Sequence, residues 1–235
     1  MRAVLLPPGL GALAVLLLPG GPLLAQQADL PPAAAPQPQR PPTLVVKFNV
    51  FQPLVRGYHL EIEKTLRAFP RHSLGLTLQG YCGPVTELTA RRDVQPDERV
   101  RGYGAELLYR LYFPGTNPDP LMGFYLGLGP HVQRFELHFQ ADGWQQQLAD
   151  DGLKYYQYGP LPYRETIRRQ GAAVVAGYQG PLDLGPLTLD FYVGLGWRQS
   201  SFRSSFASSR YRSSDFDYGA RGFYFPIGFK LGAAL

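Results

Sequence analysis

The segment LTLDFYVGLGWRQ, at residues 187–199, constrains the fold most strongly because it alternates apolar residues with polar residues or glycines throughout. One parity holds Leu187, Leu189, Phe191, Val193, Leu195 and Trp197. A period of two places successive side chains on opposite faces, so the segment is predicted to be a β-strand. Its apolar face must pack against a protein core or against lipid.

Other segments of the chain repeat this alternation. We predict eight strands, at about 43–52, 56–65, 71–82, 99–113, 121–139, 164–179, 186–199 and 219–235. The connectors after the second, fourth and sixth strands are short, whereas those at 83–98, 140–163 and 200–218 are long. Residues 144–156, within one long connector, are predicted to form a short helix. Short turns on one rim and long loops on the other are typical of a transmembrane barrel.

Glycine recurs on the strand face opposite the apolar one. It occupies positions 102 and 104, then 123, 127 and 129, then 194 and 196. Glycine weakens a strand and marks crowding, which the narrow interior of an eight-stranded barrel supplies. Small residues there leave room for Tyr125, Tyr192 and Tyr224. We therefore predict an all-β fold, an eight-stranded antiparallel up-and-down transmembrane β-barrel whose apolar face meets lipid, with Trp197 and Tyr103 at a membrane interface.

The chain divides into three parts by composition. Residues 1–25 carry Arg2, an apolar stretch and a small residue at Ala25, which is typical of a secretory signal peptide. Prolines and glycines interrupt this stretch too early for a membrane-spanning helix. Residues 26–42, QQADLPPAAAPQPQRPP, read as a Pro-rich linker, and 43–235 as the barrel. An exported barrel implies a location in the bacterial outer membrane.

Two stretches carry a family resemblance. NVFQPLVRGYHLEIEK (49–64) and GYGAELLYRLYF (102–113) are similar to a large group of small OmpA-like outer-membrane barrels without an assigned function. The resemblance covers 43–235 and implies the architecture, the outer-membrane location and the barrel insertion machinery as a partner. That machinery reads a terminal aromatic residue in such barrels, whereas this chain ends on Leu235.

Five charged residues are predicted to lie at similar heights on the inward face: Lys47, Glu61, Arg110, Asp190 and Lys230. Lys47 with Glu61, and Asp190 with Lys230, would pair between neighbouring strands. An unpaired charge in a filled interior is costly, so we predict a packed ionic plug. The alternative is a narrow ion path or a proton relay.

The long connector SSFRSSFASSRYRSSDFDYG interleaves Arg203, Arg210 and Arg212 with aromatic residues. Arginine pairs with phosphate through two parallel hydrogen bonds, so these three residues are predicted to contact lipopolysaccharide. The alternative is a solvated, Ser-rich extension of the hairpin.

Several functional classes are disfavoured. The net charge of +5 comes without a clustered basic run, which argues against nucleic-acid binding. The single cysteine, Cys82, allows no intrachain disulfide or C-x-x-C pair. The four histidines, His59, His72, His131 and His138, lack metal-ligand spacing, and no G-x-S-x-G motif is present. We predict no catalytic residue, cofactor or metal.

The predicted function is that of a structural or surface-interaction protein whose partners are outer-membrane lipid and lipopolysaccharide. Two alternatives remain open at this point. One is a barrel enzyme that modifies lipid A or phospholipid, which would need a Ser–His–acid set near the rim. The other is a soluble, secreted, lipocalin-like binder.

Overall fold

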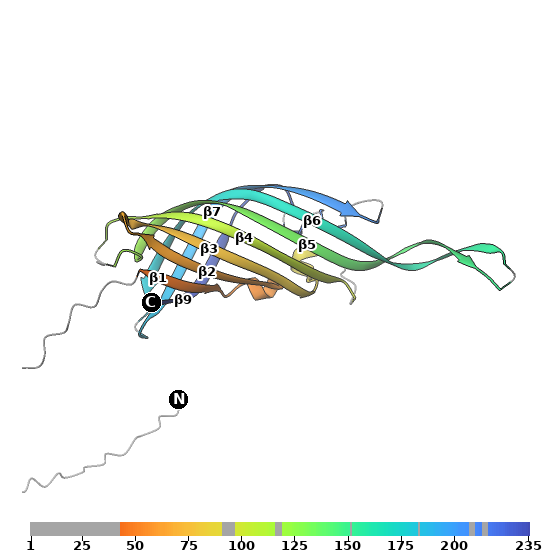
Figure 1. Ribbon diagram of the computed structural model, residues 1–235, viewed down its shortest axis with the longest axis horizontal. Coiled ribbons are helices and arrows are strands. Elements are labelled where there is room, and N and C mark those ends of the chain that lie inside the picture. Colours follow the sequence, from red (N-terminus) through yellow and green to blue (C-terminus); the bar gives the residue numbers. More distant parts are fainter. Residues whose placement is uncertain are drawn as a thin grey trace, which may run out of the picture. The chain divides into compact units, whose positions relative to one another are not determined.

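The computed structural model describes residues 43–90, 97–115, 119–150, 152–182, 184–206, 210–212 and 216–235. The predicted signal peptide (1–25) and linker (26–42) lie outside the described residues. The strands are β1 (Leu44–Asn49), β2 (Gly57–Leu66), β3 (Phe69–Pro84), β4 (Arg99–Tyr112), β5 (Gly123–Leu148), β6 (Lys154–Pro181), β7 (Leu187–Ser204), β8 (Gly222–Tyr224) and β9 (Ile227–Ala234). Figure 1 shows them wound into a barrel.

The ring closes between the first strand and the last. From β1 to β7, each strand pairs antiparallel with its neighbours along the chain, and β9 pairs with both β7 and β1. β8 also pairs with β7, so β8 and β9 form one eighth strand interrupted at Phe225 and Pro226. Proline has no N–H to donate, which explains the interruption. The predicted eight-stranded antiparallel up-and-down barrel is confirmed.

Two short helical segments accompany the strands. The 3₁₀ turn η1 (Gln52–Val55) joins β1 to β2, and α1 (Glu87–Ala90) follows β3. Among the described residues, no helix has the length and apolar character needed to cross a membrane.

The predicted helix at 144–156 is wrong, because β5 and β6 continue through this region as one long hairpin. Their ladder runs from Gly123 opposite Gln179 to Leu148 opposite Lys154. Trp144 lies opposite Tyr158, with the ring centroids 5.2 Å apart. Cross-strand aromatic pairs and residues of high β propensity stabilise a ladder, and here they prevail over the helical pattern. The hairpin extends beyond the other strands in Figure 1.

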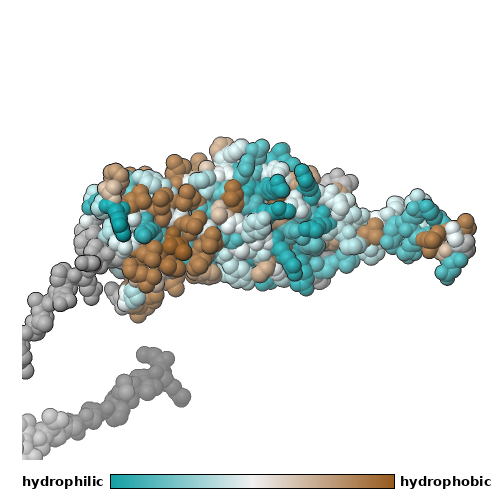
Figure 2. All heavy atoms as spheres, in the orientation of Figure 1, coloured by the Kyte–Doolittle hydropathy of each residue, from teal (hydrophilic) through white to brown (hydrophobic). Residues whose placement is uncertain are grey.

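Apolar side chains face outward near the short-turn end of the barrel. On β5 the outward residues from Phe124 to Val132 are apolar, or proline at one position, and the next outward residue is Arg134. Nine residues at about 3.4 Å each, tilted by about 40°, rise about 23 Å, close to the apolar band of transmembrane barrels. Figure 2 shows hydrophobic residues gathered toward this end and hydrophilic residues beyond.

Three inward tyrosines each lie opposite a glycine of the neighbouring strand: Tyr125 opposite Gly177, Tyr192 opposite Gly228, and Tyr224 opposite Gly196. A Cβ added at Gly177 would lie 2.5 Å from Cζ of Tyr125. Side chains in a protein interior are close-packed, so a methyl group at this position would displace the ring. The glycines therefore make room for large side chains in the lumen.

Candidate functional site

Six charged side chains from five strands meet inside the barrel. We call this group the ionic cluster: Lys47 (β1), Glu61 and Glu63 (β2), Arg110 (β4), Asp190 (β7) and Lys230 (β9). All six side chains are at most 6% exposed. Three cations face three carboxylates, so the ionic cluster is formally neutral when all six groups are ionised.

The contacts in the ionic cluster are short and shared. Nζ of Lys47 lies 2.8 Å from a carboxylate oxygen of Asp190 and 2.5 Å from one of Glu63. The two Nη atoms of Arg110 lie 2.7 Å from Glu61 and 2.5 Å from Glu63. Nζ of Lys230 lies 2.5 Å from Glu61. Each ion therefore has a counter-ion in contact, which is the arrangement that a buried charge requires.

The structure brings all five predicted lumen charges together, with different pairing. Lys47 lies 3.3 Å from Glu61, the partner expected for it. Asp190 is opposite Lys230 in the strand register, yet the Lys230 ammonium bonds to Glu61 and Asp190 bonds to Lys47. Sequence reasoning missed Glu63, although it shares the parity of Glu61 within HLEIEK and was therefore already on the inward face.

Neutral groups complete this part of the lumen. The hydroxyl of Tyr112 donates to Glu63 at 2.8 Å and that of Tyr125 donates to Asp190 at 2.6 Å. Gln179 accepts a hydrogen bond from Lys47. These tyrosines also belong to an apolar cluster, completed by Val45, Leu108, Leu121 and Val175. The lumen is consequently filled by side chains at this height.

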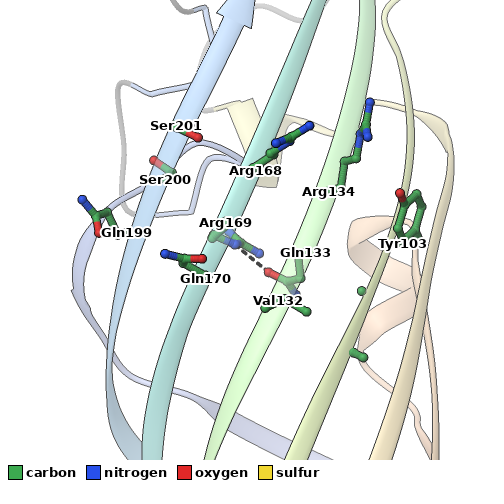
Figure 3. A pocket seen from close by; sticks show the side chains of 12 residues that line it. Tyr103, Val132, Gln133, Arg134, Arg168, Arg169, Gln170, Gln199, Ser200 and Ser201 are labelled. Carbon is green, nitrogen blue, oxygen red and sulfur yellow. Dashed lines mark hydrogen bonds between the residues drawn. The ribbon is translucent and has the colours of Figure 1, made fainter.

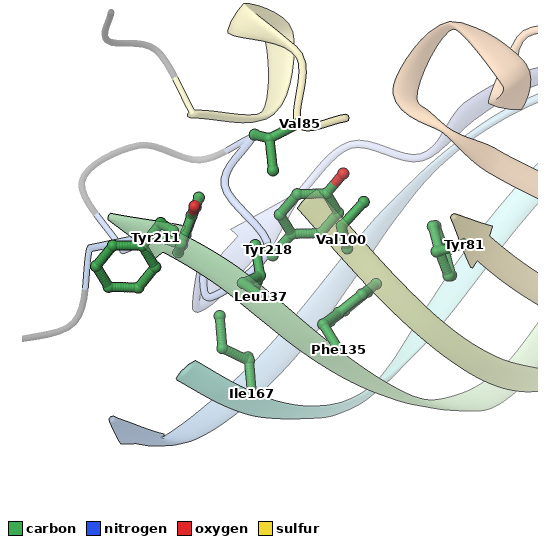
Figure 4. Close-up of a cluster of buried hydrophobic side chains, with 9 residues drawn as sticks. Tyr81, Val85, Val100, Phe135, Leu137, Ile167, Tyr211 and Tyr218 are labelled. Carbon is green, nitrogen blue, oxygen red and sulfur yellow. The ribbon is translucent and has the colours of Figure 1, made fainter. Parts of the chain in front are cut away.

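A second filled region lies toward the long-loop end (Figure 4). We call it the apolar plug: Tyr81, Val85, Val100, Phe135, Leu137, Phe139, Ile167, Tyr211 and Tyr218. Tyr211 and Tyr218 come from the segment after β7, so part of this connector folds into the barrel mouth. The hydroxyl of Tyr211 donates to the buried Glu98 at 2.7 Å.

The three arginines predicted to contact lipopolysaccharide lie in different surroundings. Arg210 lies 2.8 Å from Glu98, with its guanidinium 4.9 Å from the centroid of Phe139. Arg212 lies over the ring of Phe202, and Arg203 is exposed on β7. The structure does not bring all three to one exposed surface, because Arg210 forms an internal ion pair.

A band of arginines instead follows the outward face of β4–β7, just beyond the apolar residues. We call it the basic band: Arg99, Arg101, Arg134, Arg164, Arg168 and Arg203. Arg134 lies directly opposite Arg168. Both line a hollow of about 750 Å³, shown in Figure 3, with Tyr103 and Ser201 on the flanking strands. Like charges directly opposite each other destabilise a sheet, so this pair favours an anion between the two strands.

Glu136 is the carboxylate within the basic band. Hydrogen bonds from Arg164 and His138 lower its pKa below the usual range, so it is ionised at neutral pH. Glu136 forms an ion pair with Arg164 and lies two positions along the ladder from the Arg134–Arg168 pair. Sequence reasoning missed the basic band because its arginines are scattered over four strands and form no run along the chain.

Three of the four histidines bond to tyrosine hydroxyls, and the fourth bonds to a glutamate. His59 bonds to the Tyr81 hydroxyl at 2.8 Å, His131 to that of Tyr224 at 3.3 Å, and His72 to that of Tyr109. His138 bonds to Glu136 at 3.0 Å. In the described ranges, no group of three or more His, Cys, Asp or Glu residues has the arrangement of a metal site. Cys82 is exposed on β3.

Comparisons with known proteins give limited similarity. No protein-family model matches the chain, and no curated protein matches it in sequence. Among solved structures, the chain is similar to Acinetobacter baumannii CarO, with 11% identity, a TM-score of 0.37, and coverage of 83% of this chain and 98% of CarO. It is also similar to CarO2 of the same organism, with 13% identity, a TM-score of 0.34, and coverage of 82% and 96%.

Proposed function

We propose that this chain is a bacterial outer-membrane barrel with a closed lumen, which serves as a structural and surface-interaction protein rather than as a pore or an enzyme. The observation that carries the proposal is an exposed apolar band around an interior filled by ion pairs. As part of this proposal, we assign the chain to the small OmpA-like outer-membrane barrels that its sequence resembles.

The distribution of residues between the two faces supports the membrane location. Phe124 is 68% exposed and Leu128 is 57% exposed, while the charged side chains of the ionic cluster are buried. Large contiguous apolar surfaces are rare on soluble monomers. A soluble lipocalin-like binder presents polar residues to water, so the exposed apolar residues seen here disfavour that alternative.

The ionic cluster supports a non-conducting lumen. Its six groups hold one another at hydrogen-bond distance, and tyrosines fill the space around them at that height of the barrel. A permeating ion would have to separate buried pairs, and removing one partner from such a pair costs about 3–5 kcal/mol. This cost favours the ionic plug over an ion path.

Fractionation and conductance measurements test the proposal together. We expect the protein in the outer-membrane fraction, with an electrophoretic band that shifts on heating, and no stable conductance steps in planar bilayers. A protein recovered in the aqueous phase without detergent would reject the membrane location. Regular conductance steps from the purified protein would reject the closed lumen.

The basic band supports lipopolysaccharide as the surface partner, and of the three arginines predicted to contact it only Arg203 belongs to this band. It lies where the outward face changes from apolar to charged, the height at which lipid phosphates meet a membrane protein. Binding of purified lipopolysaccharide tests this role: the pair Arg134→Gln and Arg168→Gln should weaken it. The matched control changes Arg67 and Arg71, which are exposed at the short-turn rim. Equal loss in both pairs would point to charge alone and reject a specific site.

The non-enzymatic assignment is tested on lipid substrates. Three of the four histidines bond to tyrosine hydroxyls and the fourth to Glu136, so a serine nucleophile has no histidine base in contact within the described residues. We expect lipid A and phospholipid to remain unchanged in cells that produce the protein. A modified lipid that disappears when His138 is replaced by alanine would establish the enzyme instead.

A further inference from the structure

A cavity of about 620 Å³ lies inside the barrel; we call it the side chamber. Tyr81 and Tyr218 of the apolar plug line it toward one end of the barrel. Tyr192 lines it toward the other end, where its ring centroid lies 4.5 Å from Nζ of Lys230 in the ionic cluster. The side chamber therefore lies between the two filled regions of the lumen.

The barrel wall beside the side chamber lacks a continuous ladder. β8 pairs with β7, and no second strand pairs with it within the described part of the chain. The reason is that β1 ends at Asn49, after which the chain forms η1. The side chamber reaches the barrel wall between η1 and β8, and we call this place the gap. Gln52 and Val55 of η1 line it on one side, and Phe223 and Phe225 line it on the other.

The residues at this gap are apolar and exposed. Phe223 and Phe225 are 70% and 77% exposed, and Ile227, Leu88 and Phe216 are exposed beside them. Phe223 lies opposite Trp197, the last apolar residue on the outward face of β7 before Gln199. The gap therefore opens sideways at the outer margin of the apolar band, where lipid chains are within reach.

The interior of the side chamber is lined by polar and charged side chains. Two arginines, Arg169 and Arg198, and one carboxylate, Glu106, line it together with His59 and His131. The hydrogen bonds of Arg169 within the described residues go to neutral oxygens: the Gln133 side chain at 2.6 Å, and the carbonyls of Asp217 and Tyr218 at 3.5 and 3.4 Å. An anion beside Arg169 would supply the counter-charge that these neutral oxygens do not provide.

We infer that the side chamber binds a fatty acid, with its carboxylate at Arg169 and its hydrocarbon chain leaving through the gap between η1 and β8. The volume lies within the range of small-molecule sites, and arginine binds a carboxylate through two parallel hydrogen bonds. Phe223 and Tyr224 of β8 line this cavity, and an open strand edge is tolerated at membrane depth where it lines a cavity within the protein. The inference rests on the proposed membrane location.

Fluorescence of cis-parinaric acid tests the inference with the full barrel in nanodiscs of phosphatidylcholine. Ala173 lines the side chamber and is 8% exposed, whereas the adjacent Ala172 is exposed on the outward face. We expect saturable binding by the unmodified protein and by Ala172→Phe. Ala173→Phe should weaken the binding at least about tenfold, because the phenyl ring occupies the cavity. Ala173→Leu fills less of the side chamber and should also weaken the binding, so it serves as a second variant if Ala173→Phe does not fold.

The head group is tested separately with the methyl ester of cis-parinaric acid. The ester lacks the charge, so it should bind at least about tenfold more weakly than the acid. Arg169→Gln should weaken binding of the acid and leave that of the ester unchanged. Equal binding of acid and ester, or unchanged binding in both Ala173 variants, would overturn the inference. The heat-dependent band shift is recorded on each sample, so a folded barrel that binds nothing rejects the side chamber and retains the proposed membrane barrel.

Discussion

Lys47 and Asp190 lie 143 positions apart in the chain, yet the ammonium of one is 2.8 Å from the carboxylate of the other. They come from β1 and β7, which are separated in the ring by β9. Because both side chains are fully buried, each provides the neutralising charge that the other needs. The contact ties the start of the barrel to its end.

Replacing one of these two residues should be strongly destabilising. Asp190→Asn leaves the ionic cluster with one excess positive charge, and we expect it to lower the free energy of unfolding by about 3–5 kcal/mol. Urea titration of the barrel in lipid vesicles measures this loss. Asp142→Asn is the control, because Asp142 is exposed on the β5–β6 hairpin. Adding Lys47→Met restores neutrality, so the double variant should lose less than the sum of the single losses; simple additivity would argue against a coupled cluster.

Gly177 should not tolerate a side chain. In Gly177→Ala the new methyl group would meet the Tyr125 ring and, at 2.7 Å, the carbonyl oxygen of Phe191. We expect a loss of about 1–3 kcal/mol in the same titration, since overpacking displaces neighbours that are already fixed. Gly159→Ala, in the same strand, meets no atom within 4 Å and should be neutral or slightly stabilising. Equal effects at both positions would contradict the packing argument.

Glu98 should hold the segment after β7 in the barrel mouth. It accepts hydrogen bonds from Arg210 at 2.8 Å and from Tyr211 at 2.7 Å. In Glu98→Gln the ion pair is lost, and we expect trypsin to cleave after Arg210 several-fold faster, because local opening becomes easier. Cleavage after Arg203, which is already exposed, provides the internal reference and should not change. An unchanged ratio of the two cleavages would show that Glu98 does not anchor this segment.

The outer part of the β5–β6 hairpin should be dispensable for folding. Residues 142–160 extend beyond the apolar plug, and their ladder pairs only the two hairpin strands with each other. Replacing them with an Asn-Gly turn between Ala141 and Leu161 should leave the heat-dependent band shift intact, because two-residue turns of this type match the strand twist. Loss of the folded band would mean that the hairpin takes part in barrel assembly. Unchanged lipopolysaccharide binding is also expected, since the removed residues include none of the arginines of the basic band.

The face of the barrel that a strand residue occupies can be predicted from the sequence for a simple physical reason. Which face of a strand a residue occupies depends only on its parity, so Phe124, Tyr125 and their neighbours could be assigned to lipid or lumen without any tertiary information. The wrong prediction of a helix at 144–156 came from a helix-like spacing of apolar residues. In the structure this segment belongs to the β5–β6 hairpin, where aromatic residues pair across the two strands. The membership of Glu61 and Arg110 in the lumen follows from the same rule.

Contacts between strands depend on ring closure and register, which no local pattern contains. Only the closed ring shows that Lys230 bonds to Glu61, that Arg134 lies opposite Arg168, and that β8 has an unpaired edge beside η1. The amino-acid sequence by itself determined the strands, their two faces and the inward position of the charges, because backbone geometry sets these residue by residue. The tertiary structure alone decided which charges meet and where the wall is interrupted, because strand register and the break at Pro226 set distances between residues far apart in the chain.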